Sequence, residues 1–243
     1  MDNLTFTTLL QIQLAILVAA LVAIIVHQYA KQHSEEFGLV SKISNYFLIG
    51  LGAFALLIYV NFEPLSPRPN YWDAFHYYIG SKYFPEIRYD RFYACVAKAE
   101  SESEDPSIRF AAQTRHITDL TSKNRVVPAS LYLDDAYCKA RFSTERWNNF
   151  KSDVSFFHSK MASNKAWAAI QLDRGYNGSP VWALAGGAIS NMLPLSDTTL
   201  KNIALIDVLF LFGCAVCLAW AFGLPTASFA VIVSTVSDIA NWS

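Results

Sequence analysis

The chain has 243 residues, of which 53% are hydrophobic and only 16% are charged, and its mean hydropathy of +0.24 is high for a soluble domain. Its 19 Lys and Arg side chains nearly balance its 20 Asp and Glu side chains. This excludes the strongly basic surface of a nucleic-acid-binding protein, so DNA and RNA are not expected partners.

The first apolar run covers residues 6–26. It carries no charge, and Gln11 and Gln13 are its strong polar interruptions. At ~1.5 Å per residue it makes ~30 Å of helix, enough to cross a bilayer. A cleaved signal peptide is the alternative, but the residues before the run include an acid and no Lys or Arg, and the run exceeds a usual signal core. We therefore expect a transmembrane helix.

Further apolar runs follow along the chain. Residues 43–62 carry no charge and end at Glu63 and a segment of three prolines, where a helix cannot continue. Residues 203–224 are interrupted only by Asp207, and Ser196 is the expected N-cap of their helix. The last stretch, residues 228–240, is too short to span comfortably, so we expect a re-entrant piece or a helix that ends early. The sequence predicts three to four spans.

The predicted organisation is a pair of spans within residues 1–62, a large loop over residues 63–201, and a third span with a short apolar end within residues 202–243. The loop holds 17 of the Lys and Arg and 15 of the Asp and Glu residues, but a loop of this length cannot be oriented by its own charges. Lys31 and Lys42 in the short connection favour a cytoplasmic connection and an external loop. In a bacterium, the spans would contact lipids of the inner membrane and the loop would be periplasmic.

The loop is predicted to be mainly helical. Large apolar residues recur at intervals of three and four over TERWNNFKSDVSFFHSKM, which predicts an amphipathic helix at residues 144–161. A weaker helix is expected at residues 87–100, and an irregular polar stretch then runs to Arg141. Ser179 and Pro180 start another helix, whose small residues suit close packing or an interfacial position. The expected fold class is a mainly α membrane protein with a large helical extramembrane loop domain.

The four cysteines fall into two pairs. Cys95 and Cys138 lie in the loop, where an oxidising compartment would allow a disulfide; two buried free thiols are the alternative, and their spacing does not decide between the two. Cys214 and Cys217 have the spacing of a redox or metal motif. Because they lie inside an apolar helix, we interpret them as small packing residues.

The segment YWDAFHYYIGSKYFPE, residues 71–86, directly follows the second span and its proline segment. In a helix, Asp73 and His76 share one face, where a carboxylate and an imidazole can act on the head group of a lipid-linked substrate. The alternative is an interfacial aromatic belt in which Asp73 only caps a short helix. The two residues can also ligate a metal, but the pattern offers no third ligand.

Three other charged residues are candidates for a role. Arg88 and Arg91 can bind phosphate, because guanidinium matches phosphate oxygens bidentately; solvated charges at headgroup depth are the alternative. Asp207 is costly in lipid unless it faces a cavity or a partner, and snorkelling to the nearby interface is the alternative. The sequence contains none of the familiar nucleotide-binding, zinc-protease or serine-hydrolase motifs.

Three segments carry a family resemblance: DAFHYYIGSKYFPEIRYDRFYAC at 73–95, CKARFSTERWNNFKSDVSFF at 138–157 and LDRGYNGSPVW at 172–182. They resemble the N-terminal part of bacterial polytopic membrane glycosyltransferases of the C-type (GT-C) superfamily, over roughly residues 45–225. In that superfamily a helix leads into a large external loop with an acidic residue, and polyprenyl-phosphate sugars are the donors. The resemblance implies that Asp73 takes the place of the loop acid.

The sequence also departs from that superfamily. Such enzymes commonly have eight or more spans, and the later helices complete the donor site, whereas this sequence predicts fewer spans and adds a helix ahead of the one that leads into the loop. The resemblance therefore implies a truncated or degenerate relative, or a fragment. We expect an accessory subunit that packs its spans against other integral membrane proteins.

A glycosyltransferase is the alternative function. In that enzyme Asp73 would be the base or metal ligand and His76 would orient it, while Arg88 or Arg91 would bind phosphate. A polyprenyl-phosphate sugar would be the donor, and a divalent metal is the cofactor that such a site could use.

Overall fold

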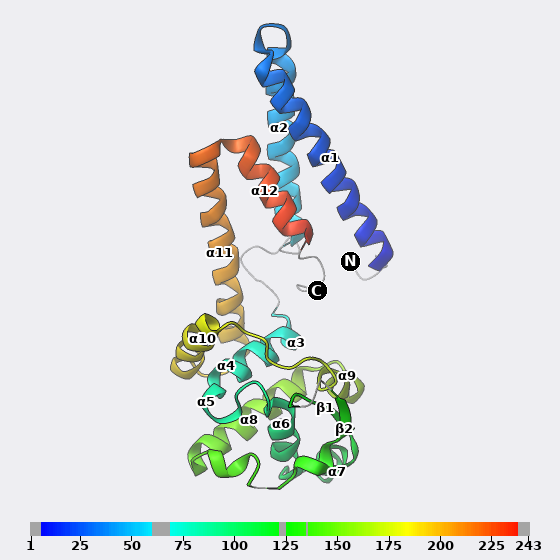
Figure 1. Ribbon diagram of the computed structural model, residues 1–243, viewed down its shortest axis with the longest axis vertical. Coiled ribbons are helices and arrows are strands. Elements are labelled where there is room, and N and C mark those ends of the chain that lie inside the picture. Colours follow the sequence, from blue (N-terminus) through cyan, green and yellow to red (C-terminus); the bar gives the residue numbers. More distant parts are fainter. Residues whose placement is uncertain (1–5, 60–68, 122–124, 135, 238–243) are drawn as a thin grey trace. The chain divides into compact units, whose positions relative to one another are not determined.

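The structure is a computed structural model that describes residues 6–59, 69–121, 125–134 and 136–237. It is 78% helical and mainly α, as the sequence predicts. Two compact units make up the chain (Figure 1). Unit 1 comprises Met1–Pro69 and Leu200–Ser243, and unit 2 comprises Asn70–Thr199.

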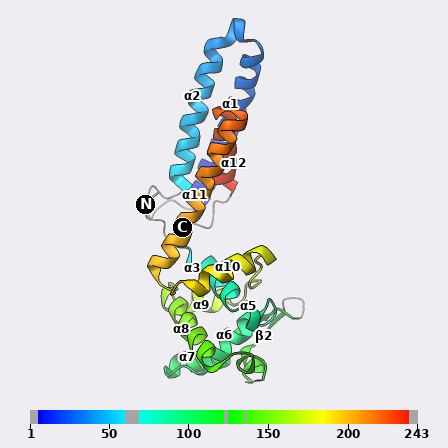
Figure 2. The ribbon, with the colours of Figure 1, turned by 90° about the vertical axis from the view of Figure 1, so that its left-hand side faces the viewer.

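Unit 1 consists of apolar helices. α1 (Phe6–Gln32) and α2 (Ser34–Tyr59) form a helical hairpin, and α12 (Leu224–Ser237) packs against both (Figures 1 and 2). Gly52 allows a close approach of α2 and α12, because a Cβ atom there would lie 3.2 Å from the Cβ of Ser228. The buried side chains of this core are Ile16, Ala20, Ala23, Leu48, Ala55, Ile232 and Val236.

Among the described residues, three helices are long and apolar enough to span a membrane: Gln11–Gln32, Glu35–Ile58 and Asp197–Phe222. They confirm that the three predicted apolar runs form long helices, although the first two helices extend further into their connection than expected. The Gln, Lys and Glu residues of that connection favour helix, so α1 and α2 meet at a turn around His33. Residues 60–62, at the end of the predicted second span, lie outside the described residues.

The helix predicted as the third span is α11 (Asp197–Phe222), and α12 follows it after a sharp turn. Gly223 has a φ of +85°, a conformation that glycine adopts without strain. The 14 residues of α12 make ~21 Å of helix, which is shorter than the hydrocarbon core of a bilayer.

Unit 2 begins with three consecutive helical segments that together form one short helix, namely α3 (Tyr71–Ala74), a π-helical turn (Phe75–Ile79) and α4 (Gly80–Lys82). The elements that follow are α5 (Phe84–Ile87), α6 (Phe92–Ser101), α7 (Pro106–Thr114), β1 (His116–Asp119), β2 (Arg125–Pro128), 3-10 turns at Ala129–Tyr132 and Lys139–Arg141, α8 (Thr144–Lys160), α9 (Asn164–Ile170) and α10 (Pro180–Met192).

The core of unit 2 is aromatic. The predicted amphipathic helix is α8, and it buries Trp147, Phe150, Val154 and Phe157. The weaker predicted helix begins later than expected, at Phe92, and all residues from Phe92 to Glu100 are buried. α6 is therefore surrounded by other elements instead of presenting a single apolar face.

The stretch between α6 and α8 is more regular than the sequence indicates. It contains α7, whose N-cap is Asp105, and an antiparallel pair of strands in which Ile117 lies opposite Val127. The Cys95–Cys138 disulfide, with Cα atoms 5.4 Å apart, ties this stretch to α6. Of the two alternatives for these cysteines, a disulfide and two buried free thiols, the structure confirms the disulfide. It is a long-range constraint that local periodicity cannot reveal.

Candidate functional site

The three segments that carry the family resemblance lie together in unit 2. The indole N–H of Trp72 donates to Asp173 Oδ2 at 3.1 Å, which joins α3 to the segment that follows α9. Tyr77 O–H donates to Asn177 Oδ1 at 2.8 Å and strengthens the same junction. On α8, Asp153 accepts from Lys82 Nζ at 2.7 Å. Residues separated by about 70 to 100 positions thus surround the helix that contains Asp73 and His76.

Asp73 lies in the first turn of α3, and its partly buried side chain is held by the helix cap. Asn70 is the N-cap: its Oδ1 accepts from the backbone N–H of Trp72 at 2.9 Å and of Asp73 at 3.3 Å. Asn70 Nδ2 donates to Asp73 Oδ2 at 3.0 Å. The cap of this helix is therefore Asn70, and Asp73 adds a favourable negative charge to the first turn.

His76 is buried and both of its ring nitrogens have partners. The backbone N–H of Gly175 donates to the Tyr93 hydroxyl oxygen at 3.0 Å, and that hydroxyl lies 2.7 Å from His76 Nε2. Since Nδ1 lies 3.0 Å from the carbonyl oxygen of Trp72, which can only accept, Nδ1 carries the proton and Nε2 accepts from Tyr93. Burial lowers the pKa of His76, while the charge of Asp173 acts in the opposite direction. His76 is thus a neutral imidazole that links α3 and α6.

The two candidate phosphate-binding arginines differ in their surroundings. Arg88 is exposed and ends α5 with a φ of +50°, a left-handed conformation that is uncommon for a residue with a side chain. Arg91 is partly buried, with Nη1 3.1 Å from Asp90 Oδ2 and its guanidinium 5.4 Å from the Tyr137 ring centre. Arg91 therefore already has an acidic and an aromatic neighbour.

The remaining sequence candidates concern metals and the third span. Within the described ranges, no group of three or more His, Cys, Asp or Glu side chains is placed to hold a metal ion. Cys214 and Cys217 are free and exposed on α11. The side chain of Asp207 lies outside the described residues, so its environment is not defined.

A buried charge on α8 was missed by the sequence analysis. Asp153 is 8% exposed and also accepts from the Tyr83 hydroxyl at 2.8 Å. Burial, followed by the charge of Asp153, raises the pKa of Tyr83. Nearby, Arg146 Nε donates to Glu86 Oε1 at 2.7 Å and its guanidinium lies over the Tyr83 ring. The helix pattern places Asp153 among the polar positions, and only the fold shows that Lys82 and Tyr83 meet it.

A second buried carboxylate, Glu100, lies at the end of α6 and was also missed. It is 5% exposed and accepts from Trp167 Nε1 at 2.8 Å. It also pairs with Arg115 and with His158 Nδ1, the latter at 2.7 Å. Burial lowers the pKa of His158, but the hydrogen bond and charge of Glu100 outweigh it, so the pKa of His158 lies above its ordinary value. This cluster holds α6, α8 and α9 together.

α11 presents an extensive apolar surface. Only 6% of its spanning window is buried within the chain. Gly213, Cys217 and Ala221 are spaced by four residues and are all exposed, so they share one face of small side chains. The exposed large apolar residues of this helix are Ile206, Leu209, Phe210, Phe212, Val216, Trp220 and Phe222.

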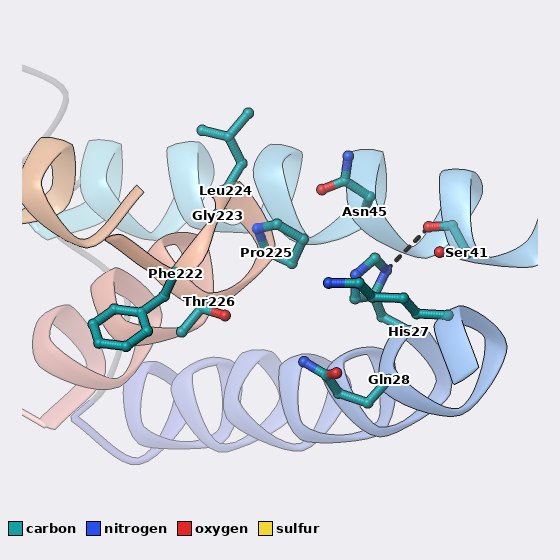
Figure 3. Close-up of a pocket in the computed structure, with 10 residues that line it drawn as sticks. His27, Gln28, Ser41, Asn45, Phe222, Gly223, Leu224, Pro225 and Thr226 are labelled. Carbon is teal, nitrogen blue, oxygen red and sulfur yellow. Dashed lines mark hydrogen bonds between the residues drawn. The ribbon is translucent and has the colours of Figure 1, made fainter. Parts of the chain in front are cut away.

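A pocket of about 360 Å³ lies in unit 1, where α1, α2 and the turn between α11 and α12 meet (Figure 3). It is not one of the sites that the sequence analysis singled out. Its lining residues are His27, Gln28, Lys31, Ser41, Asn45, Phe222, Gly223, Leu224, Pro225 and Thr226.

Comparison with known proteins gives no relative: no family model, no curated protein and no solved structure matches this chain.

Proposed function

We propose that the chain is an accessory transmembrane subunit of a larger membrane protein complex, and that α11 is the helix that packs against the partner. The observation that carries this proposal is the exposure of α11, whose spanning window is only 6% buried within the chain. Lipid satisfies an apolar surface as well as protein does, so exposure alone does not select a partner. The additional support is the face of small residues at Gly213, Cys217 and Ala221, all exposed. Such a face lets a second helix approach closely.

The proposed role of unit 2 is to cover the partner outside the membrane. Its Cys95–Cys138 disulfide is typical of an oxidising compartment. Together with Lys31 and Lys42 near the connection between the first two spans, this supports an external unit 2 and a cytoplasmic connection. We place the protein in the inner membrane of a bacterium, with unit 2 in the periplasm, on a scaffold derived from GT-C-like glycosyltransferases.

Site-specific photo-crosslinking tests the proposed face of α11. A benzophenone amino acid replaces Cys217 in one variant and Ala215 in a matched control. Residues 215 and 217 are two positions apart, so their side chains point in nearly opposite directions from the helix. Irradiation of cells should crosslink position 217 to one membrane protein and position 215 mainly to lipid. Equal yields of the same protein adducts from both positions would contradict a specific face.

The glycosyltransferase remains a second candidate because the three resembling segments meet around Asp73, which is partly exposed. The test is transfer of sugar from polyprenyl-phosphate donors by the purified protein, with and without divalent metal. On this alternative, Asp73→Asn abolishes transfer, whereas Glu104→Gln, a change to an exposed acid with no assigned role, preserves it. Equal activities of the two variants would remove Asp73 from the mechanism.

A further inference from the structure

The helix α10 has a buried face and an exposed face. Gly186, Gly187 and Ser190 are buried, and a Cβ atom at Gly187 would lie 3.0 Å from the carbonyl oxygen of Ser81. This face therefore packs closely against α4. With ~3.6 residues per turn, the opposite side of the helix carries positions 181, 184, 185, 188 and 192. All of them are exposed and apolar, and we call them the apolar face of α10: Val181, Leu184, Ala185, Ala188 and Met192.

The apolar face is unusually exposed for its composition. Val181 is 75% exposed, Leu184 79% and Met192 81%. Residues 175–196, which include all of α10, carry no charged side chain. A helix that borders water normally places charged and polar residues on its outer side, whereas α10 places its apolar residues there. A contiguous apolar patch of this kind marks a surface that another apolar phase or molecule covers.

The two points at which the chain enters and leaves unit 2 lie together. Unit 2 begins at Asn70 and ends at Thr199. Tyr71 O–H donates to Asp197 Oδ1 at 2.8 Å, and Lys160 Nζ donates to Asp197 Oδ2 at 2.6 Å. Asp197 is also the first residue of a helix that is long and apolar enough to span a membrane. When α11 crosses a bilayer, its first turn lies at the interface, and this end of unit 2 lies there with it.

α10 is fixed to the same end of unit 2. The Tyr78 hydroxyl donates to the carbonyl oxygens of Ser190 at 3.1 Å and Leu193 at 3.0 Å, which holds the last turn of α10. Thr199 Oγ1, in the first part of α11, donates to the Pro194 carbonyl at 2.7 Å. Both views show α10 and α3 at one end of unit 2 and α7 at the other (Figures 1 and 2). The apolar face is therefore continuous with the start of a predicted span.

We infer that α10 is an interfacial helix whose apolar face enters the boundary between lipid headgroups and acyl chains. The partner is the lipid bilayer itself, because the face is apolar, is free of charge and adjoins the residues from which α11 starts. Trp182, which is 37% exposed, lies beside this face, and its amphipathic ring favours headgroup depth. The inference rests on the membrane insertion within the proposed function, and it does not depend on the accessory role.

Spin labels on the purified full-length protein test the inference in vesicles of phosphatidylcholine and phosphatidylglycerol. With Cys214 and Cys217 replaced by Ser, one label is attached at Leu184→Cys and a control label at Phe110→Cys. Phe110 is 67% exposed and lies on α7, at the other end of unit 2. A third label at the native Cys214, with Cys217→Ser, reports whether α11 is inserted. Electron paramagnetic resonance then measures collisions of each label with oxygen, which dissolves in lipid, and with a nickel complex, which stays in water.

The ratio of oxygen to nickel collisions at position 184 should be severalfold higher than at position 110 and should approach the ratio at Cys214. Equal ratios at 184 and 110, with a high ratio at Cys214, would overturn the inference and leave the insertion of α11 standing. A low ratio at Cys214 would instead contradict the insertion, and the inference with it. Few collisions of either kind at 184 would show that protein covers the face, which also overturns it. Ala188→Cys, on the same face, serves if the Leu184 variant fails to fold.

Discussion

The hydroxyl of Tyr93 lies 2.7 Å from His76 Nε2, and through it the imidazole on the π-helical turn is joined to α6. The same hydroxyl oxygen accepts from the backbone N–H of Gly175 at 3.0 Å. One buried phenol therefore connects the start of unit 2, its central helix and the segment after α9. This explains why two of the resembling segments meet although about 80 residues separate them.

Replacing Tyr93 by Phe should destabilise unit 2. The change leaves His76 Nε2 and the Gly175 N–H without their shared partner in a buried place, at an expected cost of ~1–3 kcal/mol. Tyr89→Phe is the matched control, because Tyr89 is 41% exposed and donates one hydrogen bond to the Gly178 carbonyl. Thermal unfolding of the purified protein should show a clearly lower midpoint for the Tyr93 variant. Equal midpoints for the two variants would contradict the role assigned to this hydroxyl.

The Glu100–His158 pair predicts a pH dependence of stability. The pKa of His158 lies above its ordinary 6.5 in the folded state, so its contribution is fully present below pH 6.5 and is lost as the pH rises through the folded pKa. Burial raises the pKa of Glu100, but the hydrogen bonds and charges of His158 and Arg115 lower it by more. The pKa of Glu100 therefore lies below its ordinary value of 4.5. Its contribution is therefore present above pH 4.5 and is lost as the pH falls through the folded pKa.

The stabilisation from this pair should thus be greatest between pH 4.5 and 6.5. His158→Gln should flatten the decline of unfolding temperature above pH 6.5, because the variant has no titrating group beside Glu100. His116→Gln, a change to an exposed histidine in the same unit, should leave the profile as it is in the unmodified chain. A His158→Gln profile parallel to that of the unmodified chain would show that the pair is not linked to folding.

The disulfide should contribute substantially to stability. It closes a loop of 43 residues between two buried cysteines, and a constraint of this size is worth ~2–4 kcal/mol in the chain-entropy description. Replacing Cys95 and Cys138 by Ala should lower the unfolding midpoint. Replacing Cys214 and Cys217 by Ser should leave the stability of unit 2 unchanged, because both are free and exposed. Equal losses of stability in the two double variants would contradict the stabilising role of the disulfide.

Two glycines should respond differently to the same substitution. A Cβ atom at Gly80 would lie 2.4 Å from Tyr176 Cγ, so Gly80→Ala forces a buried ring to move and should cost ~1–3 kcal/mol. At Gly50 a Cβ atom meets nothing within 4 Å. Gly50→Ala should be neutral or stabilise α2 by up to ~1 kcal/mol, since alanine favours helix more than glycine does. The midpoint of thermal unfolding, measured for both variants in the same detergent, should be lower for Gly80→Ala and unchanged or higher for Gly50→Ala than for the unmodified chain.

Several features could be predicted from the sequence because their signals are local. The three long apolar helices follow from the length of their apolar runs. α8 follows from the spacing of Trp147, Phe150, Val154 and Phe157, and α10 follows from its Ser179–Pro180 start. In each case a few neighbouring residues determine the element, and the rest of the fold only has to accommodate it.

Other features depend on distant residues and leave no local signal. Asp153 occupies an apparently polar position of α8, and its burial follows from Lys82 and Tyr83, which lie about 70 positions away. The spacing of Asp73 and His76 indicates a shared helix face, but the π-helical turn, Tyr93 and Gly175 determine the surroundings of the imidazole. The pocket in unit 1 is formed by three separate chain segments, so no sequence motif marks it.

Native mass measurement after extraction in a mild detergent tests the central claim most directly. The account predicts that the 27.2 kDa chain travels in a fixed ratio with a larger membrane protein. Gly213→Leu should dissociate the assembly, because a Cβ at Gly213 meets nothing within this chain but would block a closely packed partner helix; Ala215→Leu on the other side should not. A lone chain of 27.2 kDa from unmodified membranes, or an assembly unaffected by Gly213→Leu, would contradict docking through this face of α11.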